Sequence, residues 1–298
     1  QFIFNYNIIG LELIAGRVSS FFGEELILGS FISRLFPLLF GSLFIYFLDK
    51  KNLFKIIFFI ICFNIVILSG ERTALFNFIF FILVFLIFGK FNNFNLFKLV
   101  IFSLISALII FIFEIFLLER NIDETSHYRF LNETKEQIFS NSIDYKKLNF
   151  YSESHENMAI TAINIWYNHK IFGSGPKTFR IECKNIDNFL IDQQGICSSH
   201  PHNILLQILS ETGLIGVIFF VLFLYVIFKD LFILIKEKIS IESSLYNFKL
   251  SILITFLINL FPFIPGPNFF GSYINIIFYI PMGFYIYYFR KIKYEKIF

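Results

Sequence analysis

Seven apolar segments of spanning or near-spanning length divide this chain, and they restrict it to a helical membrane fold. A lipid bilayer offers no partners for backbone N–H and C=O groups, so a single apolar segment can cross it only as a helix. The composition agrees, since 56% of the 298 residues are hydrophobic. The segments are Leu26–Leu48, Leu53–Ser69, Thr73–Gly89, Leu99–Leu118, Asn203–Phe228, Leu250–Ile264 and Tyr273–Phe289.

The segments predict an all-α integral membrane protein, a polytopic helical bundle of about seven spans forming one membrane domain over residues 1–298. The sixth segment is short and ends in FPFIPGP, so we expect it to be tilted, broken or partly re-entrant. Residues 119–202 form one large polar loop, in which MAITAINIWYNHKIFGSGPKTF predicts an amphipathic helix and a turn. The chain starts at Gln1 rather than Met, and we expect earlier spans to be missing from it.

The distribution of cations predicts the orientation of the spans. About half of the 25 Lys and Arg residues lie in short loops and the C-terminal tail on one side, as the positive-inside rule expects of cytoplasmic loops. The large loop is then on the outer side. Guanidinium groups are good bidentate ligands for phosphate, so arginines on that side suggest an anionic ligand. For Arg120, and in part for Arg129, a solvated loop position is the preferred explanation. The outer arginines are Arg17, Arg34, Arg72, Arg120, Arg129 and Arg180.

Two of the three cysteines, Cys183 and Cys197, lie in the outer loop, where an oxidising compartment permits a disulfide. The alternatives are a zinc site made with His200 and His202, or two free thiols. Cys62 lies inside an apolar segment and is most simply a small apolar side chain.

The stretch SSHPHN, residues 198–203, leads directly into the fifth apolar segment. Pro is favoured in the first turn of a helix, so the sequence places His202 and Asn203 there, beside unpaired N–H groups and the positive end of the helix dipole. Asn203, Gln207 and Glu211 follow at helical spacing as a polar stripe, which we expect to face a protein interior or a site. Glu211 is about 12 Å along the helix from Asn203, which is far for direct chemistry, so we expect it to brace a neighbouring helix.

Two arginines lie at or inside apolar segments. Arg72 follows the turn Ser69–Glu71, and it either snorkels to water as an interfacial anchor or holds a phosphate at the mouth of the bundle. Arg34 lies about two turns into the first segment and should face a polar cavity or a carboxylate. Glu114 could pair with either arginine. Among the other histidines, we interpret His127 and His169 as surface residues, whereas His155 is ambiguous.

Three segments together resemble the O-antigen ligase and polymerase family of bacterial cell-envelope enzymes. HPHNILLQILSETGLIG looks like the family's His-Asn-x-x-Leu-x-x-x-x-Glu-x-Gly signature. NHKIFGSGPKTFR is similar to its PLLGxGPxxF turn, and LSGERTALFNFIFF to its arginine-bearing periplasmic turn. RVSSFFGEELILGSFISRLFP and FPFIPGPNFFGSYINIIFYIPMGF also resemble family segments, so the resemblance covers nearly the whole chain in the expected order.

The resemblance implies a GT-C-like membrane glycosyltransferase of the bacterial inner membrane with its active site on the periplasmic face. Members move a glycan from undecaprenyl diphosphate onto a hydroxyl of lipid A-core (ligases) or of another carrier-linked unit (polymerases). Membrane lipid is a partner, and neither a cofactor nor nucleic acid is expected. The family often has a loop arginine upstream of the PLLG turn, where this chain has His155, so Arg129, Arg180 and His155 are candidate replacements.

The chemistry of this reaction suggests roles for the candidate residues. A departing diphosphate needs charge stabilisation, which Arg72, Arg34, Arg17 or Arg180 and the N-terminus of the Asn203 helix could supply. A sugar hydroxyl needs a base, and His202 is the candidate because imidazole titrates near neutrality. Direct displacement would invert the anomeric configuration and requires no metal. His200, His155, Asn203, Gln207 and Glu211 are expected to support His202.

A transporter or flippase of lipid-linked oligosaccharides is the alternative from another class. Such proteins tend to show inverted repeats and broken helices near the bilayer midplane. The chain shows no internal repeat and its polar candidates cluster at the outer face, which favours an enzyme. Nothing separates ligase from polymerase cleanly, although a polar, acidic loop without an evident lipid A-docking surface points towards a polymerase.

Overall fold

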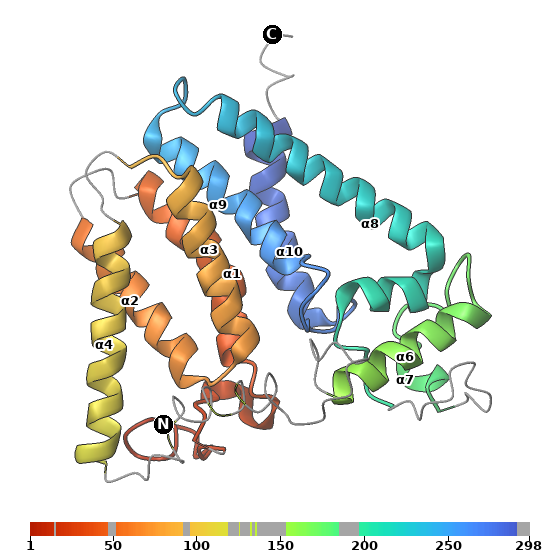
Figure 1. Cartoon of the computed structure of the whole chain (residues 1–298), viewed down its shortest axis with the longest axis horizontal. Helices are drawn as coiled ribbons and strands as arrows, with labels where there is room; N and C mark the ends of the chain where they lie inside the picture. Colours follow the sequence, from red (N-terminus) through yellow and green to blue (C-terminus); the bar gives the residue numbers. More distant parts are fainter. Residues whose placement is uncertain are drawn as a thin grey trace. The chain divides into compact units, whose positions relative to one another are not determined.

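A computed structural model of the chain describes residues 1–14, 16–46, 52–91, 96–118, 125, 132, 135, 153–184 and 197–290. Much of the predicted loop 119–202 lies outside these residues, as do Arg120, His127 and Arg129. The elements of the described part are η1 (Ser20–Glu25), α1 (Leu28–Tyr46), α2 (Asn52–Leu68), α3 (Arg72–Phe88), α4 (Leu96–Phe116), α6 (Glu153–Asn168), α7 (Phe179–Glu182), α8 (Ile204–Lys236), α9 (Ser243–Asn259), α10 (Ser272–Tyr285) and η3 (Ile286–Arg290) (Figure 1).

All seven predicted apolar segments are helical, which confirms the all-α membrane fold. By length and composition, α1, α4 and α8 can cross a membrane, and α2 and α3 are shorter apolar helices. The sixth segment was expected at Leu250–Ile264, whereas α9 begins at Ser243 and ends at Asn259. The helix therefore ends before the FPFIPGP stretch, in agreement with the expected break. Prolines cannot continue a helix without losing hydrogen bonds, so the chain from 260 to 271 forms an irregular connection.

The chain divides into two compact units, which are described separately. The first unit comprises residues 1–139, 233–258 and 290–298, and the second comprises residues 140–232 and 259–289. The single membrane domain expected from the sequence stays a prediction.

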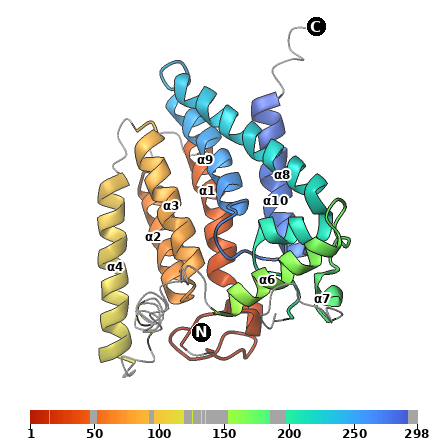
Figure 2. The same cartoon turned by 45° about the vertical axis from the view of Figure 1, so that its right-hand side comes forward.

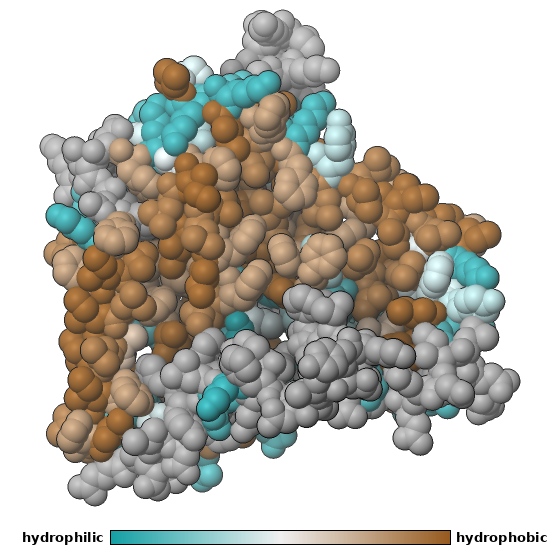
Figure 3. Space-filling model, in the orientation of Figure 1, coloured by the Kyte–Doolittle hydropathy of each residue, from teal (hydrophilic) through white to brown (hydrophobic). Residues whose placement is uncertain are grey.

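In the first unit, α1 packs on α2 and α3, and α4 packs on α2 (Figures 1 and 2). Phenylalanines fill the space between the first three helices. The Phe36 ring lies 4.4 Å from that of Phe78 and meets Phe59 edge-on at 5.5 Å, which is the geometry that aromatic rings prefer. Helix α4 by contrast leaves most of its apolar side chains exposed, as expected of a helix that faces lipid (Figure 3).

Helix α9 is joined to this bundle by paired polar contacts. The Asn247 side chain accepts a hydrogen bond from the Lys90 N–H at 2.8 Å and donates one to the Lys90 carbonyl at 2.8 Å. Near the middle of α1, a Cβ on Gly41 would overlap the side chain of Ser251, so the glycine permits close approach of the two helices.

In the second unit, α8 is not the continuous helix that the sequence predicts. It bends at Gly213, whose φ of 65° and ψ of −162° are not helical, so a short helix precedes the long apolar one (Figure 1). Apolar side chains of α6, α7 and the short helix form a small core from Ala162, Ile165, Phe179 and Leu206. Farther along α8, the buried carboxylate of Asp230 accepts a hydrogen bond from the Tyr285 hydroxyl of α10.

Candidate active site

The short helix that opens α8 begins with an asparagine cap. The Asn203 side-chain oxygen accepts a hydrogen bond from the N–H of Leu206 at 3.0 Å, which satisfies one of the unpaired donors at a helix start. The helix therefore begins at Ile204. The prediction that His202 and Asn203 occupy its first turn is wrong, because Asn203 is the cap and His202 precedes it. His202 lies just outside the helix with a φ of 50°, a left-handed conformation that is uncommon for residues other than glycine.

Three histidines come together immediately before this helix. The ring of His202 lies 4.0 Å from that of His200 and 5.8 Å from that of His155, which α6 supplies. His200 is only 8% exposed, and its Nδ1 lies 2.9 Å from the Ser199 hydroxyl oxygen. The contact of His155 with His202 depends on the packing of α6, because His155 is distant from the HPHN stretch in the sequence.

Burial keeps two of these histidines neutral. It lowers the pKa of His200 to about 4, with the charge of His202 acting in the same direction and the backbone of Gly266 opposing it. Burial also lowers the pKa of His202, and the neighbouring His155 lowers it further. A neutral imidazole has a lone pair that can accept a proton, so His202 is in the form that a general base requires at neutral pH.

The connection between α9 and α10 holds the histidine segment in place. The N–H of Gly266 donates to the His202 carbonyl at 2.7 Å, and the Asn203 side chain donates to the Pro262 carbonyl at 2.8 Å. Gln207 extends this contact, since its side chain donates to the Asn268 side chain at 2.7 Å and accepts from the Phe269 N–H at 2.8 Å. The polar stripe of the sequence thus faces a protein interior at Asn203 and Gln207.

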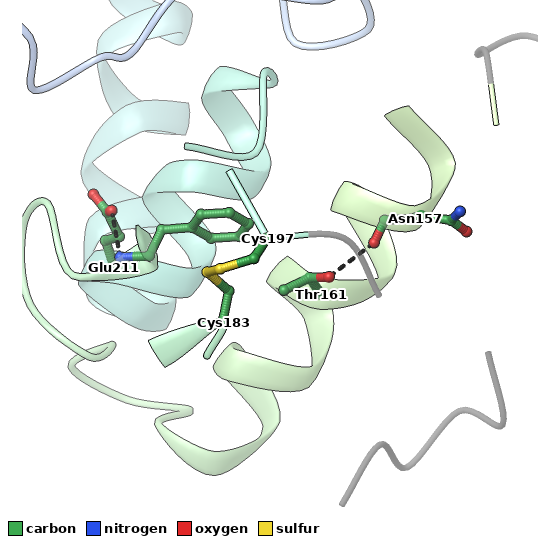
Figure 4. Close-up of a disulfide and its surroundings, with 6 residues drawn as sticks. Asn157, Thr161, Cys183, Cys197 and Glu211 are labelled. Atoms are coloured by element: carbon green, nitrogen blue, oxygen red, sulfur yellow. Dashed lines mark hydrogen bonds between the residues drawn. A yellow bond between two sulfur atoms is a disulfide. The ribbon is translucent and has the colours of Figure 1, made fainter. Parts of the chain in front are cut away.

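Glu211, the next residue of the stripe, is fully buried and organises the turn before α7. Its carboxylate accepts hydrogen bonds from the backbone N–H groups of Lys177 and Phe179, both at 3.0 Å, and from the Gln207 side chain at 3.2 Å. In Figure 4 a dashed line at the Glu211 carboxylate marks one of these hydrogen bonds. A carboxylate that accepts several N–H groups is well compensated for burial, so this geometry suits a bracing role.

The bend at Gly213 is paired with the turn that follows α6. The N–H groups of Ser174 and Gly175 donate to the carbonyls of Ser210 and Glu211 at 3.0 and 2.9 Å, and the N–H of Leu214 donates to the Lys170 carbonyl at 3.0 Å. The turn therefore satisfies backbone groups that a broken helix leaves without partners. The segments NHKIFGSGPKTFR and HPHNILLQILSETGLIG lie on the two sides of this pairing and therefore form a single structural element.

Cys183 and Cys197 form a disulfide, with a Cα–Cα distance of 5.2 Å (Figure 4). Cys183 packs against the small core of the second unit, and Cys197 lies three residues before His200. The bond thus connects the core to the start of the histidine segment. Two sulfurs bonded to each other cannot act as thiolate ligands, and the described residues contain no group of three or more His, Cys, Asp or Glu side chains that could hold a metal ion.

The charges of two candidate arginines of the first unit, Arg17 and Arg34, act on the carboxylate of Glu71. Glu71 accepts hydrogen bonds from the backbone N–H groups of Gly29 at 2.6 Å and Ser30 at 3.0 Å, so it caps the start of α1. Arg17 donates to the carbonyls of Ser69 at 2.7 Å and Leu26 at 3.1 Å. Burial raises the pKa of Glu71 to about 7, against the opposing charges of Arg17 and, more weakly, Arg34.

Arg34 is 1% exposed within α1, where its guanidinium donates to the Ser30 hydroxyl at 3.2 Å and the Ile258 carbonyl at 3.4 Å. The charge of Arg34 acts on the carboxylate of Glu71. The pairing of Glu114 with Arg34 or Arg72 stays a prediction. Arg72 is the first residue of α3 and is partly exposed. Arg180 lies on the exposed side of α7 in the second unit. Arg17, Arg34 and Arg72 belong to the first unit, and Arg180 and the histidines belong to the second.

Residues 202–213 lie within a segment of the chain that matches the model of a known protein family. The family model of the O-antigen ligases matches residues 57–221, more than half of the chain. The chain belongs to the O-antigen ligase family. It is therefore a membrane-embedded glycosyltransferase of the O-antigen ligase and polymerase type, from a family that builds the bacterial envelope with lipid-linked glycans. No curated protein and no solved structure matches the chain.

Proposed function

We propose that the chain transfers a glycan from undecaprenyl diphosphate onto a sugar hydroxyl, with His202 as the general base and without a metal ion. The observation that carries this proposal is the surroundings of His202, which lies between His155 and His200 with a lowered pKa. A neutral imidazole can take the hydroxyl proton as the oxygen attacks the anomeric carbon. The diphosphate leaves with the bonding electrons, and attack from the opposite face inverts the anomeric configuration.

The leaving diphosphate needs positive charge rather than a proton, because its own acidity makes it a good leaving group. Arg72 and Arg180 are the candidates with exposed surface, whereas Arg17 and Arg34 already donate to protein oxygens. We assign Arg17 and Arg34 an indirect part in phosphate binding, through the turn 69–72 that carries Arg72. Asn203, Gln207 and Glu211 act as positioning residues, since their side chains hold the connection 260–271 and the turn before α7.

The proposed location is the bacterial inner membrane, with the histidines at the periplasmic face. The positive-inside distribution of Lys and Arg supports this orientation, and so does a disulfide beside the histidines, because such bonds persist in oxidising compartments.

The broken helix α8 meets one criterion of a lipid-linked oligosaccharide flippase, since transporters often use discontinuous helices. In transporters the exposed backbone groups bind the cargo. Here the turn 170–175 makes hydrogen bonds with backbone groups of Ser210, Glu211 and Leu214, so these groups already have protein partners. The break in α8 therefore has a structural explanation, which favours the enzyme over the flippase.

Glycan analysis in a host that lacks its own O-antigen polymerase or ligase tests the proposal. Long chains on the lipid carrier would identify a polymerase, and transfer to lipid A-core would identify a ligase. His202→Asn should abolish transfer at normal protein level, because asparagine tolerates the left-handed backbone of His202 but cannot act as a base. The exposed His169→Asn is the matched control and should transfer normally. Normal glycans from His202→Asn would exclude His202 as the base.

A further inference from the structure

The turn after α6 carries exposed apolar side chains at the point where α8 resumes beyond its bend. Phe172 is 75% exposed and Ile171 is 58% exposed. The Ile171 carbonyl accepts a hydrogen bond from the N–H of Ile215 at 3.3 Å, next to the bond between Leu214 and Lys170. These bonds fix the apolar part of the turn to the first residues of the long apolar helix. Figures 1 and 2 both show the turn after α6 beside the bend of α8.

That helix has a surface suited to lipid. The part from Leu214 to Lys236 is about 35 Å long at 1.5 Å per residue, which is enough to cross the hydrocarbon of a bilayer. Most of its exposed side chains are apolar, from Leu214, Ile218 and Phe219 in the first turns onward, and its exposed lysines, Lys229 and Lys236, lie towards the other end. Figure 3 shows apolar surface along this helix. The turn 170–172 thus continues a lipid-facing surface at the level where the span begins.

The residues beside the turn have the chemistry of a membrane–water interface. Trp166 donates its indole N–H to the Lys170 carbonyl at 3.1 Å, and the Lys170 ammonium lies 4.0 Å from the centre of the exposed Tyr167 ring. Trp and Tyr concentrate at the headgroup level of membrane proteins. Residues 163–181 also contain three cations and no carboxylate, a balance that favours contact with phospholipid headgroups.

We propose that Trp166, Tyr167, Lys170, Ile171 and Phe172 form an interfacial anchor, in which the tip of the α6–α7 turn inserts into the phospholipid leaflet beside α8. The partner is the phospholipid surface itself. The backbone pairing of the turn with Ser210 and Glu211 then keeps the short helix, and the histidines before it, at a fixed distance from the membrane. This proposal needs only a membrane-embedded α8 and does not depend on His202 acting as a base.

Trp166 is the single tryptophan of this sequence and serves as the probe. The full-length protein is reconstituted into phosphatidylcholine vesicles with or without bromine on the acyl chains near the headgroup, and Trp166→Phe gives the background. The expected result is roughly twofold quenching of Trp166 emission by the brominated lipid, as for a side chain in the interface. Emission equal in the two lipids would overturn the anchor.

Two variants separate insertion of the turn from mere proximity of the tryptophan. Phe172→Asp places a charge at the proposed insertion point and should remove most of the quenching, and Phe172→Ser should reduce it partly. Both replace an exposed side chain, so the fold should persist. The control is Ile239→Asp, a 94% exposed apolar residue beyond the other end of α8, which should leave quenching unchanged. Full quenching in Phe172→Asp would show that the turn does not insert.

Discussion

Gly173 and Gly213 lie backbone against backbone, although the first belongs to the turn after α6 and the second to the bend of α8. A Cβ on Gly213 would overlap the Ile171 carbonyl group and the Gly173 nitrogen, and a Cβ on Gly173 would overlap Glu211 and Thr212 backbone atoms. Both glycines also have positive φ, 69° and 65°. The close contact between these two backbones therefore explains why NHKIFGSGPKTFR has a glycine at 173 and HPHNILLQILSETGLIG has one at 213.

Gly213→Ala should destabilise the second unit and lower glycan transfer. The substitution adds strain at positive φ, about 1–3 kcal/mol, and an overlap with backbone atoms that cannot move aside. The measurement is the thermal unfolding midpoint of the purified protein. Gly283→Ala is the matched control, because nothing lies within 4 Å of its added Cβ in α10, and it should be neutral or slightly stabilising. Equal midpoints for the two variants would contradict the close contact.

The sequence predicted the helices well and the bend of α8 not at all. Apolar runs identify helices because lipid forbids other structures, and each of the seven segments contains a helix, although the sixth is helical only as far as Asn259. The break at Gly213 was not predicted, since the polar residues before it also fit the polar stripe of a continuous helix, and the backbone partners of the break come from residues 170–175. The contacts of the connection 260–271 were equally invisible, because most of their partners are backbone groups, which any sequence possesses.

The candidate site was predicted in part. The sequence singled out His202 and its polar stripe, and placed Cys183 and Cys197 in one loop, but packing alone brings His155 to His202. Glu71 was noted only as a neighbour of Arg72, because its role depends on the start of α1, a distant segment. The catalytic role of His202 and the phosphate-binding role of the arginines stay predictions.

Glu211→Gln should destabilise the turn before α7. The carboxylate accepts N–H groups on both oxygens, and an amide would turn its own N–H donors towards one of them. A buried donor left without a partner costs about 1–3 kcal/mol. The exposed Glu237→Gln is the control. Hydrogen exchange at the amides of Lys177 and Phe179 is the direct readout, and unchanged protection in Glu211→Gln would count against the bracing role.

The acid limb of the activity profile should lie below pH 6.5. Burial and then the charge of His155 lower the pKa of His202 from its ordinary value of 6.5, and only the neutral form can act as a base. In His155→Gln the charge contribution is removed, so the limb should move to higher pH. The measurement is the pH dependence of kcat/KM for transfer in reconstituted protein, with His169→Gln as the control. A limb that stays in place or moves to lower pH in His155→Gln would show that His155 does not act on the base.

Glu71 predicts a pH dependence of stability in the first unit. Burial raises its pKa from 4.5 to about 7 in the folded protein. A raised pKa means that the folded state holds the proton more tightly, so this stabilisation is present below pH 4.5 and is lost as the pH rises through 7. The full pKa difference corresponds to about 3 kcal/mol of unfolding free energy. The thermal unfolding midpoint of the wild type should therefore decrease as the pH is raised from 5 to 8.

Glu71→Gln removes the titrating group while keeping a side-chain oxygen that can accept one N–H at the start of α1. Its midpoint should therefore change less between pH 5 and pH 8 than that of the wild type, whatever its absolute stability. The exposed Glu24→Gln should retain the wild-type slope. If Glu71→Gln and Glu24→Gln show the same slope, the proton on Glu71 does not couple to folding, and the carboxylate is ionised at the cap of α1 throughout this range.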